Sequence, residues 1–103
     1  MSADRFAELA APLLAEDGIT RSTMMGLPCL RLDGAFFAAL DRRSGALLVK
    51  LSQARVEELI GTGAAEPFAP AGRRFRQWAA VPSQRERSWP GLLHEALEFA
   101  AGR

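Results

Sequence analysis

The stretch that decides the fold is residues 32–51, "LDGAFFAALDRRSGALLVKL". It contains two short apolar runs, 35–40 and 46–51, and a glycine-containing pair precedes each of them, Asp33-Gly34 and Ser44-Gly45. Such pairs between apolar runs are typical of the tight turns that join antiparallel strands. The stretch therefore predicts two strands of an antiparallel meander.

The N-terminal side adds two further apolar runs and a helix. Runs 20–25 and 29–33 are bounded by turn residues, so we expect them to be strands. Before them, apolar residues repeat with the spacing of one helix face and predict a helix over 3–16: Phe6, Leu9, Ala10, Leu13 and Leu14. We expect Gly18 to end this helix and Pro12 to kink or split it.

The C-terminal side predicts two helices and one more strand. A helix over 53–61 begins after Ser52, a residue type that caps helix N-termini well. The segment 64–75 reads as a loop because two prolines and a glycine interrupt it. A strand over 74–81 and a helix from about Ser88 complete the chain.

These elements follow the order αββββα(β)βα, the bracketed strand falling between the second helix and the last strand. The order predicts an α+β fold, an antiparallel sheet of about five strands with flanking helices, and 103 residues favour one domain over 1–103. No apolar run approaches the roughly 20 residues of a membrane helix, and one cysteine cannot form a disulfide within the chain. We therefore expect a cytoplasmic protein that does not enter a membrane.

Reactive side chains are few and scattered. In "STMMGLPCL" (22–30), Cys29 is the only cysteine, and the only histidine, His94, lies 65 residues further on. We interpret this stretch as a strand, a turn or bulge at 26–28 and a second strand beginning at Cys29, and His94 as a surface partner of Glu98. Because no metal-ligand spacing and no nucleotide-binding or hydrolase motif occurs, we expect no cofactor and no metal.

Basic residues are concentrated in two segments although the net charge is only +1. Segments 21–55 and 73–87 each carry +4, and twelve of the thirteen bases are arginine. Arginine suits phosphate and carboxylate recognition, but a coding bias toward arginine gives the same composition without a functional reason, and the many alanines favour that explanation.

Strand alternation predicts a basic face on the sheet. Adjacent Phe36 and Phe37 must point to opposite faces, and helices cover one of these. The residues that alternate against the apolar positions form the candidate binding surface: Arg31, Lys50, Arg74, Arg76 and Trp78. We expect an exposed face with a tryptophan at its centre, either a homodimer seam or a binding site, the alternative being a merely solvated face.

A set of short motifs also resembles a known family. In chain order they are Met25-Gly26, Asp33-Gly34, Phe37, Leu48-Val49-Lys50, Glu66-Pro67-Phe68, Trp78, Val81-Pro82 and Trp89. Over roughly residues 20–100 their order and spacing resemble the N-terminal domain of bacterial TfoX/Sxy-type competence regulators and the related YjbR/MmcQ-like small proteins. The resemblance implies an α+β fold similar to that of type III secretion chaperones and no known catalytic activity. These regulators carry a second, C-terminal domain, whereas this sequence ends at Arg103, and it has Met24-Met25-Gly26 where the family often has Met-Phe-Gly. We therefore expect a divergent, stand-alone member.

Three classes of function are compatible with these features. The resemblance favours a non-catalytic interaction or regulatory domain that binds a protein partner or forms a homodimer. A nucleic-acid binder is the alternative, because some YjbR-like relatives carry a "double-wing" DNA-binding label and two segments are basic, although +1 is well below the usual basic footprint. An enzyme would have to rely on Cys29 and His94.

Overall fold

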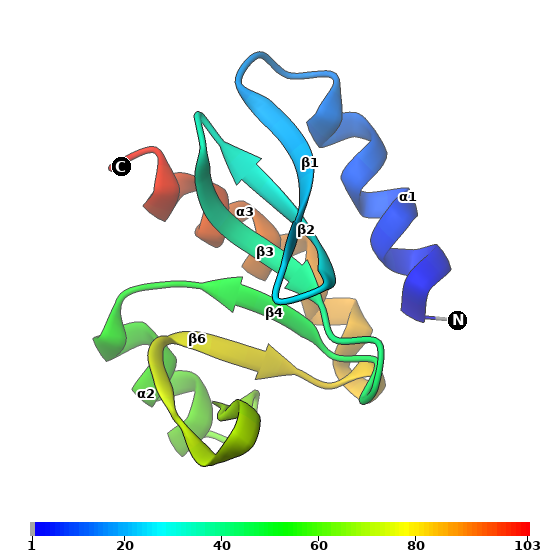
Figure 1. Ribbon diagram of the computed structural model, residues 1–103. Helices are drawn as coiled ribbons and strands as arrows, with labels where there is room; N and C mark the ends of the chain where they lie inside the picture. The colour runs from blue at the N-terminus through cyan, green and yellow to red at the C-terminus, as the bar shows by residue number, and fades with distance from the viewer. Residues whose placement is uncertain (1) are drawn as a thin grey trace.

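Six strands form one antiparallel sheet in the computed structural model, which describes residues 2–103 (Figure 1). The strand order across the sheet is β1-β2-β3-β4-β6-β5. The elements are α1 (Ser2–Leu14), β1 (Ile19–Met24), β2 (Leu27–Leu32), β3 (Ala35–Leu40), β4 (Leu47–Lys50), α2 (Gln53–Gly61), β5 (Glu66–Phe68), the 3₁₀ turn η1 (Pro70–Gly72), β6 (Phe75–Val81), the 3₁₀ turn η2 (Ser83–Ser88) and α3 (Trp89–Ala100).

The predicted α+β class and the antiparallel meander are confirmed. The strand over 35–40 and the helix over 53–61 have the predicted bounds, and the ends of the other predicted elements are shifted by at most two residues. The sixth strand, β5, takes the place of the bracketed strand in the predicted order and lies inside 64–75, a segment predicted to be loop-like. The helix predicted over 3–16 is continuous across Pro12 and ends at Leu14, two residues before its predicted end. Pro12 therefore does not split it.

The helices cover one face of the sheet and leave the other open. In Figure 1, α3 lies behind β3 and β4, which it contacts, while α1 lies beside β1 and α2 packs against β6. The main core fills the space between sheet and helices and includes Phe6, Ile19, Leu30, Phe37, Leu47, Val49, Val56, Val81, Trp89 and Leu93. No helix within residues 2–103 has the length and apolar character needed to cross a membrane.

A β-bulge between β2 and β3 sets the orientation of the two adjacent phenylalanines. Arg31 pairs with Phe36 and Leu30 pairs with Ala38, so Phe37 has no residue opposite it. Phe37 and Ala38 both join the helix-side core, whereas Phe36 packs on the other face. The prediction that Phe36 and Phe37 point to opposite faces is therefore confirmed.

Two short turns connect the first three strands. Both residues of the loop Met25-Gly26 have positive φ (51° and 78°), and so have both residues of Asp33-Gly34 (49° and 89°). Positive φ at both central residues is the signature of the type I′ turn, which suits the twist of a hairpin. The turn predicted at 26–28 therefore lies at Met25-Gly26 instead, and Pro28 is part of β2.

Gly18 does not end α1, contrary to prediction. The helix stops at Leu14, and Gly18, with φ of +86°, precedes β1, where its carbonyl oxygen accepts a hydrogen bond from the Asp33 backbone N–H (2.8 Å). A Cβ at this position would lie 2.5 Å from the Asp33 Oδ1 atom. Gly18 thus allows the close approach of the α1–β1 connection to the second hairpin turn.

Candidate binding face of the sheet

The open face carries a second, smaller apolar cluster. Its buried members are Cys29, Ala39, Leu48, Phe68 and Trp78, and the half-buried residues packed on them are Met24, Leu27, Phe36, Phe75 and Ala80. Strand pairing brings them together, since Cys29 lies opposite Ala39, Ala39 opposite Leu48, and Leu48 opposite Ala80. We refer to this cluster as the open-face cluster.

Trp78 belongs to the interior of this cluster, so the prediction of an exposed tryptophan is wrong. Its side chain is 8% exposed. The covering residues come from the segment that the sequence pattern presented as a loop: β5 pairs with β6, and Phe68 packs beside Phe75 with 5.7 Å between ring centroids. Trp78 is therefore a structural residue of the face and not its point of contact.

The predicted alternation along β6 also fails at its first residue. Phe75 was expected on the face opposite Trp78, but both pack in the open-face cluster. The cause is an irregularity in the β5–β6 pairing: Pro67 lies opposite Ala79, and the next residue, Phe68, lies opposite Phe75. Because the register jumps between these pairs, period-2 alternation does not hold across them.

Two of the four predicted basic residues, Arg31 and Lys50, lie at the open-face cluster. The Arg31 guanidinium lies over the Phe36 ring at 4.7 Å from the centroid, and its Nε donates to the Gly34 carbonyl oxygen (3.0 Å). Lys50 is half-buried opposite Trp78, and Arg74 and Arg76 are exposed near the start of β6. The structure thus brings Arg31 and Lys50 to the open face as predicted.

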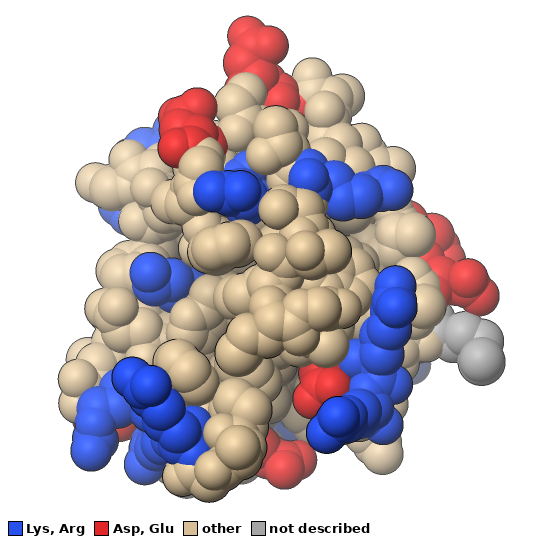
Figure 2. Space-filling view, in the orientation of Figure 1, with Lys and Arg blue, Asp and Glu red and all other residues tan. Residues whose placement is uncertain are grey.

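Two further arginines at this face were not predicted. Arg73 lies over the Phe75 ring at 5.4 Å from the centroid, and Arg43 lines the groove described below. We define the basic rim as Arg31, Arg43, Lys50 and Arg73. Figure 2 shows Lys and Arg side chains on several sides of a mostly uncharged centre.

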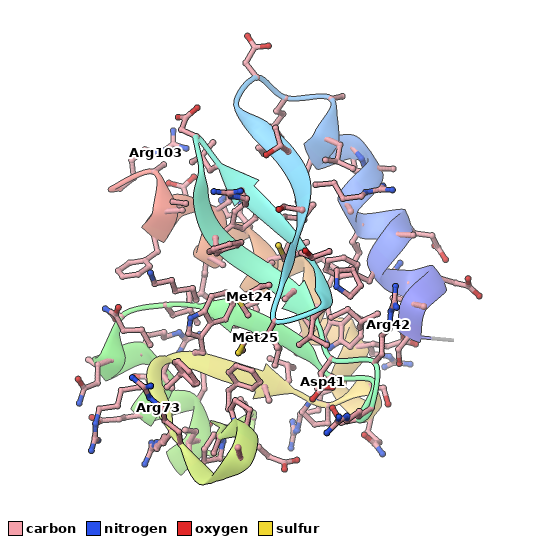
Figure 3. All side chains as sticks on the ribbon, viewed as in Figure 1. Met24, Met25, Asp41, Arg42, Arg73 and Arg103 are labelled. Carbon is pink, nitrogen blue, oxygen red and sulfur yellow. The ribbon has the colours of Figure 1, made fainter. Side chains whose placement is uncertain are left out.

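A groove runs beside the hairpin tip at this face. Its volume is about 630 Å³. It is lined by the tip of the first hairpin, the β3–β4 loop, β5 with η1, and the end of β6: Met25, Leu27, Asp41, Arg43, Ser44, Ala46, Glu66, Pro67, Phe68, Ala69, Pro70, Ala80, Pro82 and Gln84. Figure 3 shows Met24 and Met25 at the centre of the face, with Asp41 and Arg42 on one side and Arg73 on the other. The walls of the groove thus combine apolar side chains with both signs of charge.

Cys29 and His94 do not form a reactive pair. Cys29 is fully buried in the open-face cluster, where burial raises the pKa of its thiol. His94 is exposed on α3, which covers the other face of the sheet, and its Nε2 lies 3.6 Å from the Glu98 Oε1 atom, the partner that we predicted. The sheet separates the two side chains.

We expect the native Cys29 thiol to resist alkylation, because its burial disfavours the reactive thiolate. Iodoacetamide followed by mass spectrometry should modify Cys29 fully in denaturant and, over the same period, only to a few per cent in the folded protein. Rapid modification of the folded protein would show an accessible thiolate and revive the enzyme class.

A second hollow of about 500 Å³ lies near the C-terminal end of α3. It is lined in part by Glu16, Asp17 and Asp33. Within residues 2–103, no three His, Cys, Asp or Glu side chains are arranged so that they could hold a metal ion. This hollow is therefore not a built metal site.

Comparison with known proteins leaves the resemblance to the TfoX N-terminal domain as a prediction. No family model, no curated protein and no solved structure matches this chain.

Proposed function

We propose that this protein is a non-catalytic interaction domain whose open face binds an acidic segment of a protein partner. The observation that carries the proposal is the combination of the open-face cluster, its groove and the basic rim on one side of the sheet. Helices cover the opposite side, so the open face is the larger sheet surface available to a partner.

The basic rim supports an acidic partner because its charges are not neutralised within the part of the chain that the structure describes. Ion pairs there join Arg5, Arg55, His94 and Arg103 to glutamates of helices, whereas no rim residue takes part in one. Arginine, methionine and aromatic side chains are enriched in protein interfaces relative to the rest of the surface. Carboxylates beside apolar anchors would complement this face.

The aromatic side chains favour a protein partner over nucleic acid, the alternative. Sequence-tolerant binding of single strands uses aromatic rings on which bases stack. Here Arg31 and Arg73 already lie over the rings of Phe36 and Phe75, and Trp78 is buried. Nucleic-acid binding would have to rely on the basic side chains of the rim without stacking on aromatic rings.

The regulatory role implied by the TfoX-type resemblance is part of this proposal. The observed α+β fold with an antiparallel sheet is the fold class that the resemblance implies. The single, fully buried and unpaired Cys29 agrees with a reducing, cytoplasmic setting.

The test reverses charge on the rim. Peptides are selected on the immobilised wild-type protein from a random twelve-residue display library, and their Kd values are measured by fluorescence anisotropy. We expect selected peptides to be rich in Asp and Glu beside large apolar residues. The variant Arg43→Glu/Arg73→Glu should raise their Kd about tenfold, with a smaller effect at high salt because exposed charges are screened.

The matched control is Arg85→Glu/Arg87→Glu, which makes the same change in net charge at two exposed residues of η2 outside the groove. It should change Kd less than twofold. Selection of basic peptides, or failure to select any, would contradict the proposal. Salt-dependent binding of a fluorescein-labelled single-stranded or duplex DNA in place of peptides would favour the nucleic-acid class instead.

A further inference from the structure

The two hairpin turns offer a comparison within one chain. Met25-Gly26 and Asp33-Gly34 have the same two-residue geometry, with first-position φ values of 51° and 49°. Asn, Asp and Gly are the residues that tolerate the first position of such a turn. Asp33 follows this rule and Met25 breaks it.

Met25 also has little packing that could offset its strained backbone. A bulky residue with positive φ is an outlier, and such outliers persist where the surrounding structure or a function requires them. The Met25 side chain is 60% exposed, and it is the one large apolar side chain with such exposure within residues 2–103. Fold stability alone would therefore favour Asn or Asp here.

The position of Met25 explains what its side chain is available for. It lies at the tip of the first hairpin, at the centre of the open face, and lines the groove together with Leu27, Phe68 and Pro70 (Figure 3). A methionine side chain has three rotatable bonds and a polarisable thioether, so it adapts to the shape of an apolar partner. An apolar group entering the groove would pack against it.

We propose that Met25 is the anchor with which the open face binds a large apolar side chain of the acidic partner segment. That side chain enters the groove between Met25 and Phe68, and the carboxylates flanking it in the partner lie against Arg43 and Arg73. This assignment rests on the function proposed above. It names the occupant as a protein segment with one large apolar residue between Asp or Glu residues, because Met25, Leu27, Phe68 and Pro70 give the groove an apolar part and the four bases of the rim outnumber Asp41 and Glu66, the two carboxylates that line it.

The experiment uses Met25→Asn on the full chain with the peptides selected above. Asparagine suits the turn, so the unfolding midpoint should rise by about 4 °C. The same change removes the anchor, so the Kd of the selected peptides should rise about tenfold. Stability and binding are thus expected to move in opposite directions, which a general loss of structure cannot produce.

Two further variants serve as controls. Met25→Leu keeps an apolar side chain and should hold Kd within about threefold of the wild-type value. Asp33→Asn places asparagine at the first position of the other turn, where the native aspartate already suits the positive φ. It should change neither the unfolding midpoint nor the Kd of the peptides. Sizing of the free wild-type protein and Met25→Asn completes the set.

The outcomes separate this inference from the proposed function. If Arg43→Glu/Arg73→Glu weakens peptide binding and Met25→Asn does not, the anchor is wrong and the binding face stands. If no acidic peptide is selected, both fail. A midpoint that does not rise would overturn the strain argument. Conversion of a wild-type dimer to a monomer by Met25→Asn would make a second copy of this chain the occupant and overturn the assignment.

Discussion

Replacing Phe37 with alanine is expected to lower the free energy of unfolding by about 3–5 kcal/mol. Phe37 is fully buried in the helix-side core. It has no residue opposite it in the bulge, and it shares this orientation with the small Ala38, so no neighbouring side chain of β3 can fill the cavity. Because domains are commonly stable by only about 5–15 kcal/mol, this single change removes a large part of the total.

The adjacent Phe36→Ala is the matched control. Phe36 is half-buried on the open face, where its ring faces the Arg31 guanidinium. Its truncation should cost about 1 kcal/mol, since part of the ring is already in water and a cation–π contact at an exposed site contributes little. Denaturant unfolding of both variants measures the difference. Equal costs would mean that the bulge between β2 and β3 is misplaced.

Local signals were sufficient to predict the first part of the sheet. The Asp33-Gly34 turn permits a two-residue hairpin, which requires the chain to reverse and pair at once. The strand over 35–40 therefore had its bounds predicted correctly. The cap at Ser52 worked in the same way: its Oγ accepts from the Arg55 backbone N–H (3.2 Å), and α2 begins where predicted.

The second half of the sheet depends on pairing between distant segments, and local patterns do not encode it. β5 has only three residues and contains Pro67, which a strand tolerates at a sheet edge. Its contact with β6 is what buries Trp78 and brings Phe75 onto the open face. Alternation along β6 alone could not reveal either result.

The candidate site was predicted in part. Arg31 and Lys50 reach the open face because alternation holds along their own strands, β2 and β4, the extra residue of the bulge being Phe37 in β3. Arg73 precedes β6, and its position over Phe75 depends on the irregular β5–β6 register. Met25 carried a readable signal, a bulky residue directly before glycine between two apolar runs, but the sequence did not show that the turn was at Met25-Gly26.

Replacing Trp78 with alanine is expected to lower the free energy of unfolding by about 3–5 kcal/mol, the range for large aromatic side chains in a core. The side chain is 8% exposed and packs among Phe68, Phe75 and Leu48. Its loss would leave a cavity beside Phe68 of β5, the edge strand that pairs with β6. The nearby Arg76→Glu changes an exposed side chain and should stay within about 0.5 kcal/mol of the wild type.

Guanidinium unfolding of Trp78→Ala and Arg76→Glu, together with their Kd values for the selected peptides, decides whether Trp78 stabilises the fold or contacts a partner. If it is structural, Trp78→Ala weakens peptide binding only as far as the face loses its shape, and Trp78→Phe recovers most of both stability and binding. A Trp78→Ala protein with unchanged stability and lost binding would instead restore Trp78 to the contact surface. The packing of Trp78 against Phe68 of β5 would then be wrong.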